Sequence, residues 1–354
     1  MKAWLLLLSL LLLLGSCGET KDSNDLQLVR PQTAHGFARQ AWQMDSLYSR
    51  MAITEQENNL QWKAVISPHD DYSYVGSLYH EALRGVNAPN IILIGVAHRA
   101  RNFGLQDKIV FGNYSHWETP YGKIAVSPAN REIMDKLPAE HYIVHDSMQL
   151  IEHSLEAIVP WIQRKNRDTN IIPILVPYIN YEDIETISSK LAEAVKQVME
   201  DRNWKFGKDV AIVISNDAVH YGDQEWGSTS DMAPFGTDSA GTAAAREKDL
   251  EIIDRCLTGE ISSDKIKLFT EYTVEEEDYK EYKWVWCGRY SVPFGLAFAN
   301  RLNQVQHDQS LKGTFLGYQS SIDHPAVRVE DLGMETTAIA TDRHWVAYTA
   351  IQYE

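Results

Sequence analysis

The sequence contains little cysteine and fewer basic than acidic residues. Of 354 residues, three are Cys, 33 are Lys or Arg and 49 are Asp or Glu, so the formal net charge is −16. This acidity argues against a nucleic-acid partner, because binding to phosphates needs a basic face. Beyond the N-terminal region only Cys256 and Cys287 remain. They could pair in an oxidising compartment, but two thiols do not make a disulfide framework.

Long apolar runs are also lacking, with one exception at the N-terminus. Residues 1–16 carry one Lys before an apolar stretch that has the length of a signal-peptide core and is short for a membrane span. The quartet Leu14-Gly15-Ser16-Cys17 resembles the bacterial lipobox, in which the cysteine becomes the lipidated first residue. An ordinary signal peptide with an incidental cysteine is the alternative.

We therefore expect an exported protein that a lipid on Cys17 anchors to a bacterial membrane, on the periplasmic or cell-surface side. Residues 17–30 are mostly small and polar, and this composition predicts a flexible tether. The remaining residues, 31–354, contain no repeat and no low-complexity linker, and we expect them to form one domain.

Four short apolar runs, each rich in Val or Ile, alternate with helical patterns. The runs cover residues 64–67, 90–97, 170–179 and 209–215. They do not alternate with polar residues, which is typical of strands covered on both faces. Helical patterns cover residues 77–84, 150–167, 181–202, 237–257 and 291–303. This order predicts an α/β fold with a mostly parallel, helix-covered central sheet.

Histidines follow three of these predicted strands. His69 comes after the first run, His98 after the second and His220 after the last. In open α/β sheets, the carboxyl ends of the strands form the crevice where ligands bind. We therefore expect a site at this edge of the sheet, with histidines that only stabilise loops as the alternative.

Two further segments carry groups that could join this site. His153 and Glu156 lie three residues apart at the start of the helix predicted over 150–167. Cys287 comes just before the helix predicted from residue 291, where the helix dipole favours a thiolate. Imidazoles with a thiolate or carboxylate bind zinc, iron or copper rather than magnesium or calcium. The spacing favours a metal site and leaves the reaction open.

Several motifs, in this order, resemble the Memo family, whose bacterial members are known as protein B of the AmmeMemoRadiSam system. The motifs are PHDDYSYVG (68–76), LIGVAH (93–98), ETPYGKI (118–124), IEHSLEAIVPW (151–161), PILVP (173–177), SNDAVHYG (215–222), CGR (287–289) and FLGYQSS (315–321). The resemblance implies an α/β fold similar to class III extradiol dioxygenases, which are non-haem iron enzymes.

The resemblance also implies roles for individual residues. His69, His98 and Cys287 match the metal-binding set of the family, through its P-H-A-G-Y, G-P-S-H and C-G-R motifs. The residues that would act as acids or bases are His220, Asp217 and His153. The residues that we expect to line the substrate pocket are Asp70, Asp71, Tyr72, Glu152 and Arg289.

The chain departs from the family pattern at three motifs. Asp70 and Asp71 stand where P-H-A-G-Y has Ala and Gly, which adds two carboxylates beside the first expected ligand. Val96 and Ala97 replace the Pro and Ser of G-P-S-H, and Asn216 replaces a serine. The expected ligands are kept, so we expect these changes to alter pocket polarity and substrate. The two aspartates are the expected source of specificity.

Together these observations predict a dioxygenase-like redox enzyme that uses iron or copper, or zinc, on an unknown small-molecule substrate. One alternative is a metal-binding surface lipoprotein without catalytic activity. Another is a hydrolase with Cys287 as nucleophile and His220 as base. Partners from the AmmeMemoRadiSam system are expected by family analogy only.

Overall fold

The computed structural model describes residues 28–51, 53, 60–223, 232–323, 325–337 and 340–354. The expected signal peptide, the expected lipidation at Cys17 and almost all of the expected tether lie in residues 1–27, outside the described residues. Within the described ranges, no helix is both long and apolar enough to cross a bilayer.

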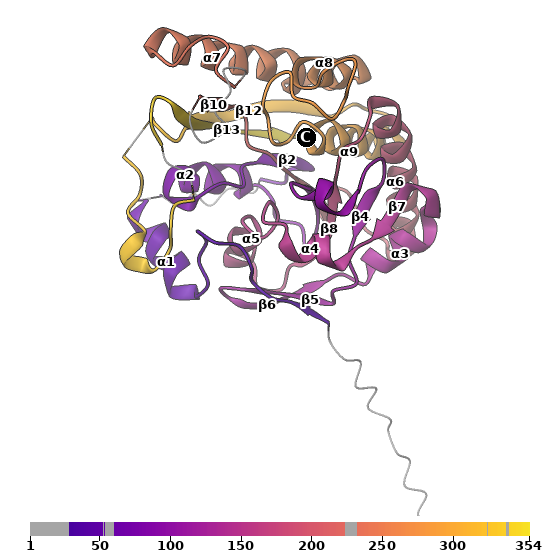
Figure 1. Cartoon of the computed structure of the whole chain (residues 1–354). Coiled ribbons are helices and arrows are strands. Elements are labelled where there is room, and N and C mark those ends of the chain that lie inside the picture. Colours follow the sequence, from indigo (N-terminus) through magenta and orange to yellow (C-terminus); the bar gives the residue numbers. More distant parts are fainter. Residues whose placement is uncertain (1–27, 52, 54–59, 224–231, 324, 338–339) are drawn as a thin grey trace, which may run out of the picture.

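Strands and helices alternate along most of the chain (Figure 1). The strands are β1 (Val29–Arg30), β2 (Ala64–Ser67), β3 (Asn90–Val96), β4 (Ile109–Phe111), β5 (His116–Thr119), β6 (Gly122–Val126), β7 (Tyr142–Val144), β8 (Asn170–Val176), β9 (Val210–Ser215), β10 (His220–Gly222), β11 (Gly259–Glu260), β12 (Lys312–Ser320) and β13 (His344–Tyr353). The α-helices are α1 (Ala41–Arg50), α2 (Tyr72–Leu83), α3 (Ala129–Lys136), α4 (Asp146–Ile151), α5 (Val159–Lys165), α6 (Tyr181–Arg202), α7 (Ser239–Ile252), α8 (Ser263–Thr273) and α9 (Ser291–His307). A π-helical turn over Ile253–Leu257 continues α7.

The central sheet has the strand order β1-β5-β6-β8-β3-β9-β2-β13-β12-β11. Its middle strands β8, β3, β9 and β2 are parallel to one another and correspond to the four apolar runs of the sequence. Beyond β2, the strands β13, β12 and β11 pair antiparallel. The predicted α/β fold with a largely parallel sheet is confirmed.

Helices cover both faces of the parallel strands. Figure 1 shows α1, α2 and α5 on the left of the sheet and α3, α6 and α9 on the right. In β2, Ile66 belongs to the apolar cluster that contains α6 and α9, whereas Val65 belongs to the cluster that contains α1, α2 and α5. A strand covered on both sides buries every position, which is why these runs show no alternation with polar residues.

Two helix predictions need correction. Helix α2 begins at Tyr72 rather than at residue 77, because Tyr72, Val75 and Tyr79 already bury the same face of the helix. The single helix predicted over 150–167 is two helices, α4 and α5, with a non-helical link between them. Glu152 has extended backbone angles at the end of α4, and a proline in the first turn of α5 favours a new helix start there.

Candidate metal centre

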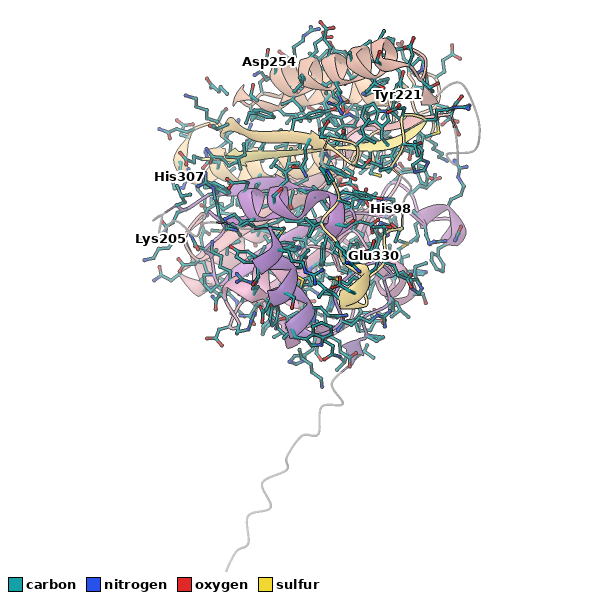
Figure 2. All side chains as sticks on the ribbon, turned by 90° about the vertical axis from the view of Figure 1, so that its left-hand side faces the viewer. His98, Lys205, Tyr221, Asp254, His307 and Glu330 are labelled. Atoms are coloured by element: carbon teal, nitrogen blue, oxygen red, sulfur yellow. The ribbon has the colours of Figure 1, made fainter. Side chains whose placement is uncertain are left out.

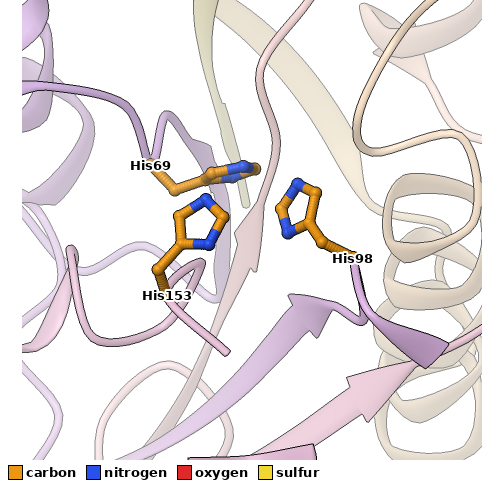
Figure 3. Close-up of side chains that lie close together, drawn as sticks. All are labelled: His69, His98 and His153. Carbon is orange, nitrogen blue, oxygen red and sulfur yellow. The ribbon is translucent and has the colours of Figure 1, made fainter. Parts of the chain in front are cut away.

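The side chains of His69, His98 and His153 converge at the carboxyl edge of the parallel strands (Figure 3). One ring nitrogen of each lies within 4.8 Å of the others. The ring centroid of His69 lies 5.1 Å from that of His98 and 5.6 Å from that of His153. The rings of His98 and His153 are stacked, with their centroids 4.5 Å apart. His69 and His98, which follow two different strands, therefore lie close together, as the sequence predicted.

The strands place these residues because their ends are in register. Ser67 at the end of β2 pairs with Ser215 at the end of β9, and β3 lies on the other side of β9. His69 and Asp217 each come two residues after those paired serines. Figure 2 shows His98 on the opposite side of the molecule from Lys205 and His307.

A second group of donor atoms shares His69. One donor atom each of His69, Asp217 and Cys287 lies within 4.8 Å of the other two, and all three residues are buried. The sulfur of Cys287 lies 2.8 Å from Nε2 of His220. The expected metal set of His69, His98 and Cys287 is thus divided between two overlapping groups, which meet at His69.

The proton on the His69 ring is fixed by its neighbours. Its Nδ1 lies 2.8 Å from Oγ of Ser215, and that hydroxyl donates to the carbonyl of Ser154 at 2.9 Å. Since the hydroxyl has only one proton to donate, it accepts from His69, whose Nδ1 therefore carries the hydrogen. The lone pair of His69 is then on Nε2, which lies 3.2 Å from Oδ2 of Asp217.

His98 is oriented in the same way by a buried carboxylate. Its Nδ1 donates to Oε1 of Glu152 at 2.8 Å, and its backbone N–H donates to Oε2 at 2.8 Å. Oε1 of Glu152 also accepts the backbone N–H of Ser154 at 2.9 Å. Burial opposes ionisation of Glu152, but its electrostatic attraction to His98 and the hydrogen bond from that ring outweigh the effect of burial and lower the pKa of Glu152 to about 2. The lone pair of His98 is left on Nε2.

The other titratable groups of the site are shifted toward their neutral forms. Burial, together with the nearby His98, lowers the pKa of His69 well below its usual range. The same causes lower the pKa of His153, whose ring stacks on His98 although part of its side chain is exposed. The same two causes lower the pKa of His220 to about 3. Burial and the charges of neighbouring carboxylates raise the pKa of Asp217 and of Cys287. Neutral imidazoles are the form that metals bind.

The loops after β9 and before α9 hold each other in place. The backbone N–H of Cys287 donates to the carbonyl of Asp217 at 3.2 Å, and that of Gly288 donates to the side chain of Asn216 at 3.1 Å. A Cβ atom at Gly288 would collide with Asn216, so glycine is required by this close approach. Asn216, a departure from the family pattern, therefore positions the segment that carries Cys287.

Asp249, on α7, is hydrogen-bonded to both of these loops. Its carboxylate accepts hydrogen bonds from the indole N–H groups of Trp284 and Trp286, both at 2.7 Å, from the hydroxyl of Tyr318 and from the backbone N–H of Val219. Val219 and Trp286 directly precede His220 and Cys287. The sequence interpretation missed Asp249, although two indole groups in one buried segment need hydrogen-bond acceptors.

A pocket of about 550 Å³ opens beside the histidines. His69, Asp70 and His153 line it, together with Arg99, which the sequence interpretation did not assign to the pocket. The side chain of His153 is 42% exposed, whereas that of Glu152 is 1% exposed. The pocket therefore reaches the centre along the exposed side of His153.

The two aspartates expected to line the pocket have different surroundings. Asp70 lines it, but its oxygens accept hydrogen bonds from the backbone N–H of Asp71 and from the hydroxyl of Tyr348, both at 2.7 Å. Asp71 is buried and accepts the backbone N–H of Thr337 at 2.5 Å. Asp71 therefore ties the C-terminal segment to the start of α2.

Two further expected pocket residues lie in packed surroundings. The hydroxyl of Tyr72 donates to the carbonyl of Ala157 at 2.6 Å, and its ring packs edge-on against Trp161. The guanidinium of Arg289 lies 3.4 Å from the ring centre of Tyr282 and 4.6 Å from that of Tyr290. Neither residue is among the described residues that line the 550 Å³ pocket.

Another hollow, of about 730 Å³, lies between α1, α2 and α5. Tyr48, His80 and Lys165 are among its lining residues, and none of the histidines of the centre is. The ammonium group of Lys165 donates to the backbone carbonyls of Leu83, Arg84 and Val86 at the end of α2. This lysine is therefore engaged in capping a helix rather than available to a ligand.

The model of the Memo-like protein family matches residues 39–337. The chain belongs to this family. A MEMO1 family protein of Aquifex aeolicus is 30% identical over 181 residues, which are 51% of this chain and 62% of the relative. A MEMO1 family protein of Thermotoga neapolitana is 30% identical over 175 residues, 48% of this chain and 58% of the relative.

A longer match is found with a MEMO1 family protein of Pyrococcus abyssi. It is 25% identical over 256 residues, which are 71% of this chain and 79% of the relative. The matches to the Aquifex and Thermotoga proteins span less than two thirds of those relatives. Membership of the Memo-like family is thus established over the residues that carry the candidate metal centre.

Proposed function

We propose that this Memo-like protein is a metal-dependent redox enzyme that holds iron or copper at the edge of its sheet. The observation that carries the proposal is the pair His69 and Asp217. The lone pair on Nε2 of His69 lies 3.2 Å from a carboxylate oxygen, while the ring proton of His69 is directed at Ser215. Because the pKa of Asp217 is raised, the two electron-pair donors share a proton, which a metal cation would replace on binding.

The chemistry of the donor set fits this group of metals. The donor atoms form two groups that share His69: nitrogens of His98 and His153 complete one, and the carboxylate of Asp217 with the sulfur of Cys287 completes the other. Transition metals bind both kinds of donor set. The Nδ1–H group of His98 donates a hydrogen bond to the buried carboxylate of Glu152, an arrangement that is usual for metal-binding histidines. A bound iron or copper would supply electron transfer to or from a substrate.

The remaining groups would bind and move protons. His153 stacks on His98 at the mouth of the site and is neutral, so it can accept a proton from a substrate hydroxyl in the pocket. Glu152 lies 3.6 Å from Nδ1 of His153 and would stabilise the imidazolium that forms. Nε2 of His220, 2.8 Å from the sulfur of Cys287, would take the proton of that thiol when the sulfur binds a cation.

Elemental analysis of protein purified without oxygen tests the proposal. The wild type is expected to hold iron or copper, while His69→Ala and Cys287→Ala lower the metal content and keep the circular dichroism of the wild type. Cys256→Ala, a change at a buried cysteine outside the site, serves as control. Full metal occupancy in both site variants would overturn the assignment.

Oxygen consumption by the iron-loaded protein with catechols distinguishes an enzyme from a binding protein. Consumption above the rate of free iron supports the redox proposal. Tight metal binding without consumption favours the alternative of a metal-binding protein that does no chemistry.

The contact between Cys287 and His220 favours a second candidate, a cysteine hydrolase. A sulfur 2.8 Å from an imidazole nitrogen is the geometry of a nucleophile beside its base. The burial of Cys287 and its raised pKa weigh against it, because the nucleophile must be a thiolate that a substrate can reach. Metal-free protein that keeps full activity toward ester substrates would favour the hydrolase.

A further inference from the structure

Among the described residues that line the pocket beside His69 and His153, Arg99 is the one permanently charged cation. This residue directly follows His98, and its side chain is exposed at the pocket. The charge of Arg99 acts on His153, whose pKa is lowered first by burial, then by His98, and further by Arg99. A positive charge in a chain with a net charge of −16 concentrates anions locally at this mouth.

Arg99 makes no ion pair, side-chain hydrogen bond or ring contact among the residues that the structure describes. Within the same ranges it shares this property with Arg301 of α9, whereas the other arginines pair with carboxylates, carbonyls or aromatic rings, as Arg50 does with Asp331. The guanidinium of Arg99 therefore has its hydrogen-bond donors available to a molecule in the pocket.

The lining of the pocket also includes large apolar side chains. Phe37 and Ile151 line it, and the side chain of Ile151 is 37% exposed although it is a large hydrophobic residue. Both oxygens of Asp70 accept hydrogen bonds from Asp71 and Tyr348, so this carboxylate is not directed toward Arg99 as an ion-pair partner. A ligand that fits this lining has one anionic end and one apolar body.

We propose that the substrates of this pocket are small organic carboxylic acids. Their carboxylate binds the guanidinium of Arg99, and their apolar body packs against Phe37 and Ile151 in the pocket that His69 and His153 also line. An arginine fork matches one carboxylate bidentately, and the described lining of the pocket offers no second Lys or Arg for the further charge of a phosphate. This assignment of a substrate class rests on the proposed function of the same site.

The test compares binding of benzoate and of benzamide, its uncharged isostere, by calorimetry. The purified full chain is used both as isolated and after chelation, because a metal would itself bind the carboxylate. The wild type is expected to bind benzoate about tenfold more tightly than benzamide in both forms, the effect of a charge-assisted hydrogen bond. Arg99→Gln removes this preference, and Arg99→Lys keeps part of it.

Arg301→Gln is the matched control, since it removes the other arginine without a partner among the described residues. Its preference for benzoate is expected to equal that of the wild type. An unchanged preference in Arg99→Gln, or an equal loss in Arg301→Gln, would overturn the assignment.

Metal analysis and oxygen consumption of the same samples separate this inference from the proposed function. If the chain binds no metal but the preference depends on Arg99, the carboxylate site stands and the redox proposal falls. If metal and oxygen consumption are present but Arg99→Gln behaves as the wild type, the substrate class alone is overturned.

Discussion

The imidazole of His153 stacks on that of His98, with the ring centres 4.5 Å apart and the planes inclined by 21°. The two rings differ in their surroundings: His98 donates to Glu152, whereas the side chain of His153 is 42% exposed in the pocket. Both rings lie close enough to His69 for their nitrogens to bind one cation. The structure thus leaves two roles for His153, a third nitrogen ligand or a base that faces the substrate.

His153→Gln decides between these roles. We expect the variant to keep the metal content of the wild type and to lose about 100-fold or more in the rate of oxygen consumption, the usual contribution of a positioned base. Metal content is measured by mass spectrometry and the rate by an oxygen electrode. If metal content falls as far as in His69→Ala, His153 is a ligand.

Glu152→Gln tests the orientation of His98. A glutamine can accept the hydrogen of His98 Nδ1, but its amide nitrogen cannot accept the backbone N–H that the second carboxylate oxygen now accepts. We expect metal affinity to fall by about 10- to 100-fold, as for other partners of metal-binding histidines. Glu275→Gln, an exposed change outside the site, is the control. Equal affinity in both variants would show that Glu152 is not needed for metal binding.

The parallel core could be predicted because each of its strands is buried on both faces. The run Ala64–Ser67 is strand β2 with the same bounds, and every residue in it is buried. The ten-residue strand β13 gave no such signal, since polar residues such as Thr349 and Gln352 interrupt it. Both residues are nevertheless buried, and the hydroxyl of Thr349 donates to the carbonyl of Gly317.

The strand-end histidines His69 and His98 could be predicted because a sheet brings the ends of its parallel strands together. The hydrogen-bond acceptors that determine which ring nitrogen carries the proton could not be predicted. Ser215 lies 146 residues from His69, and Glu152 lies 54 residues from His98. Arg99 gave no signal either. A single charged residue after a strand is usually a solvated one, and its role depends on the absence of partners that only a structure can show.

Asp71 is a residue that the sequence assigned to the pocket but that has a structural role. Two adjacent carboxylates beside His69 predict a polar pocket, and Asp70 does line it. Asp71 instead binds Thr337, which is 266 residues away in the sequence. A carboxylate that holds two segments together and one that faces a ligand have the same signature in a sequence.

Alkylation of the two buried cysteines tests whether Cys287 is a nucleophile. Burial raises the pKa of Cys256 to about 12, and burial with the charges of Asp217 and Asp70 raises that of Cys287. In metal-free protein we expect iodoacetamide at pH 7.5 to modify both thiols much more slowly than a free thiol, since the thiolate is the reactive form. Peptide mass mapping follows each site. Rapid, stoichiometric modification of Cys287 alone would support the hydrolase.

The pH dependence of stability tests Asp249. Burial raises its pKa from 3.8 to about 6, with the hydrogen bonds of Trp284 and Trp286 opposing the rise. Between these two values the folded chain binds a proton that the unfolded chain has released, so the stability contributed by this group falls as pH rises. A variant with asparagine at this position cannot titrate.

We therefore expect the unfolding free energy of the wild type, relative to Asp249→Asn, to decrease by about 2 kcal/mol between pH 4 and pH 6.5. Urea unfolding of metal-free protein at several pH values measures this difference. Asp254→Asn, an exposed change in the turn after α7, is the control and should show no such pH dependence. A constant difference between the wild type and Asp249→Asn would mean that Asp249 stays ionised throughout this range, held by its four hydrogen-bond donors.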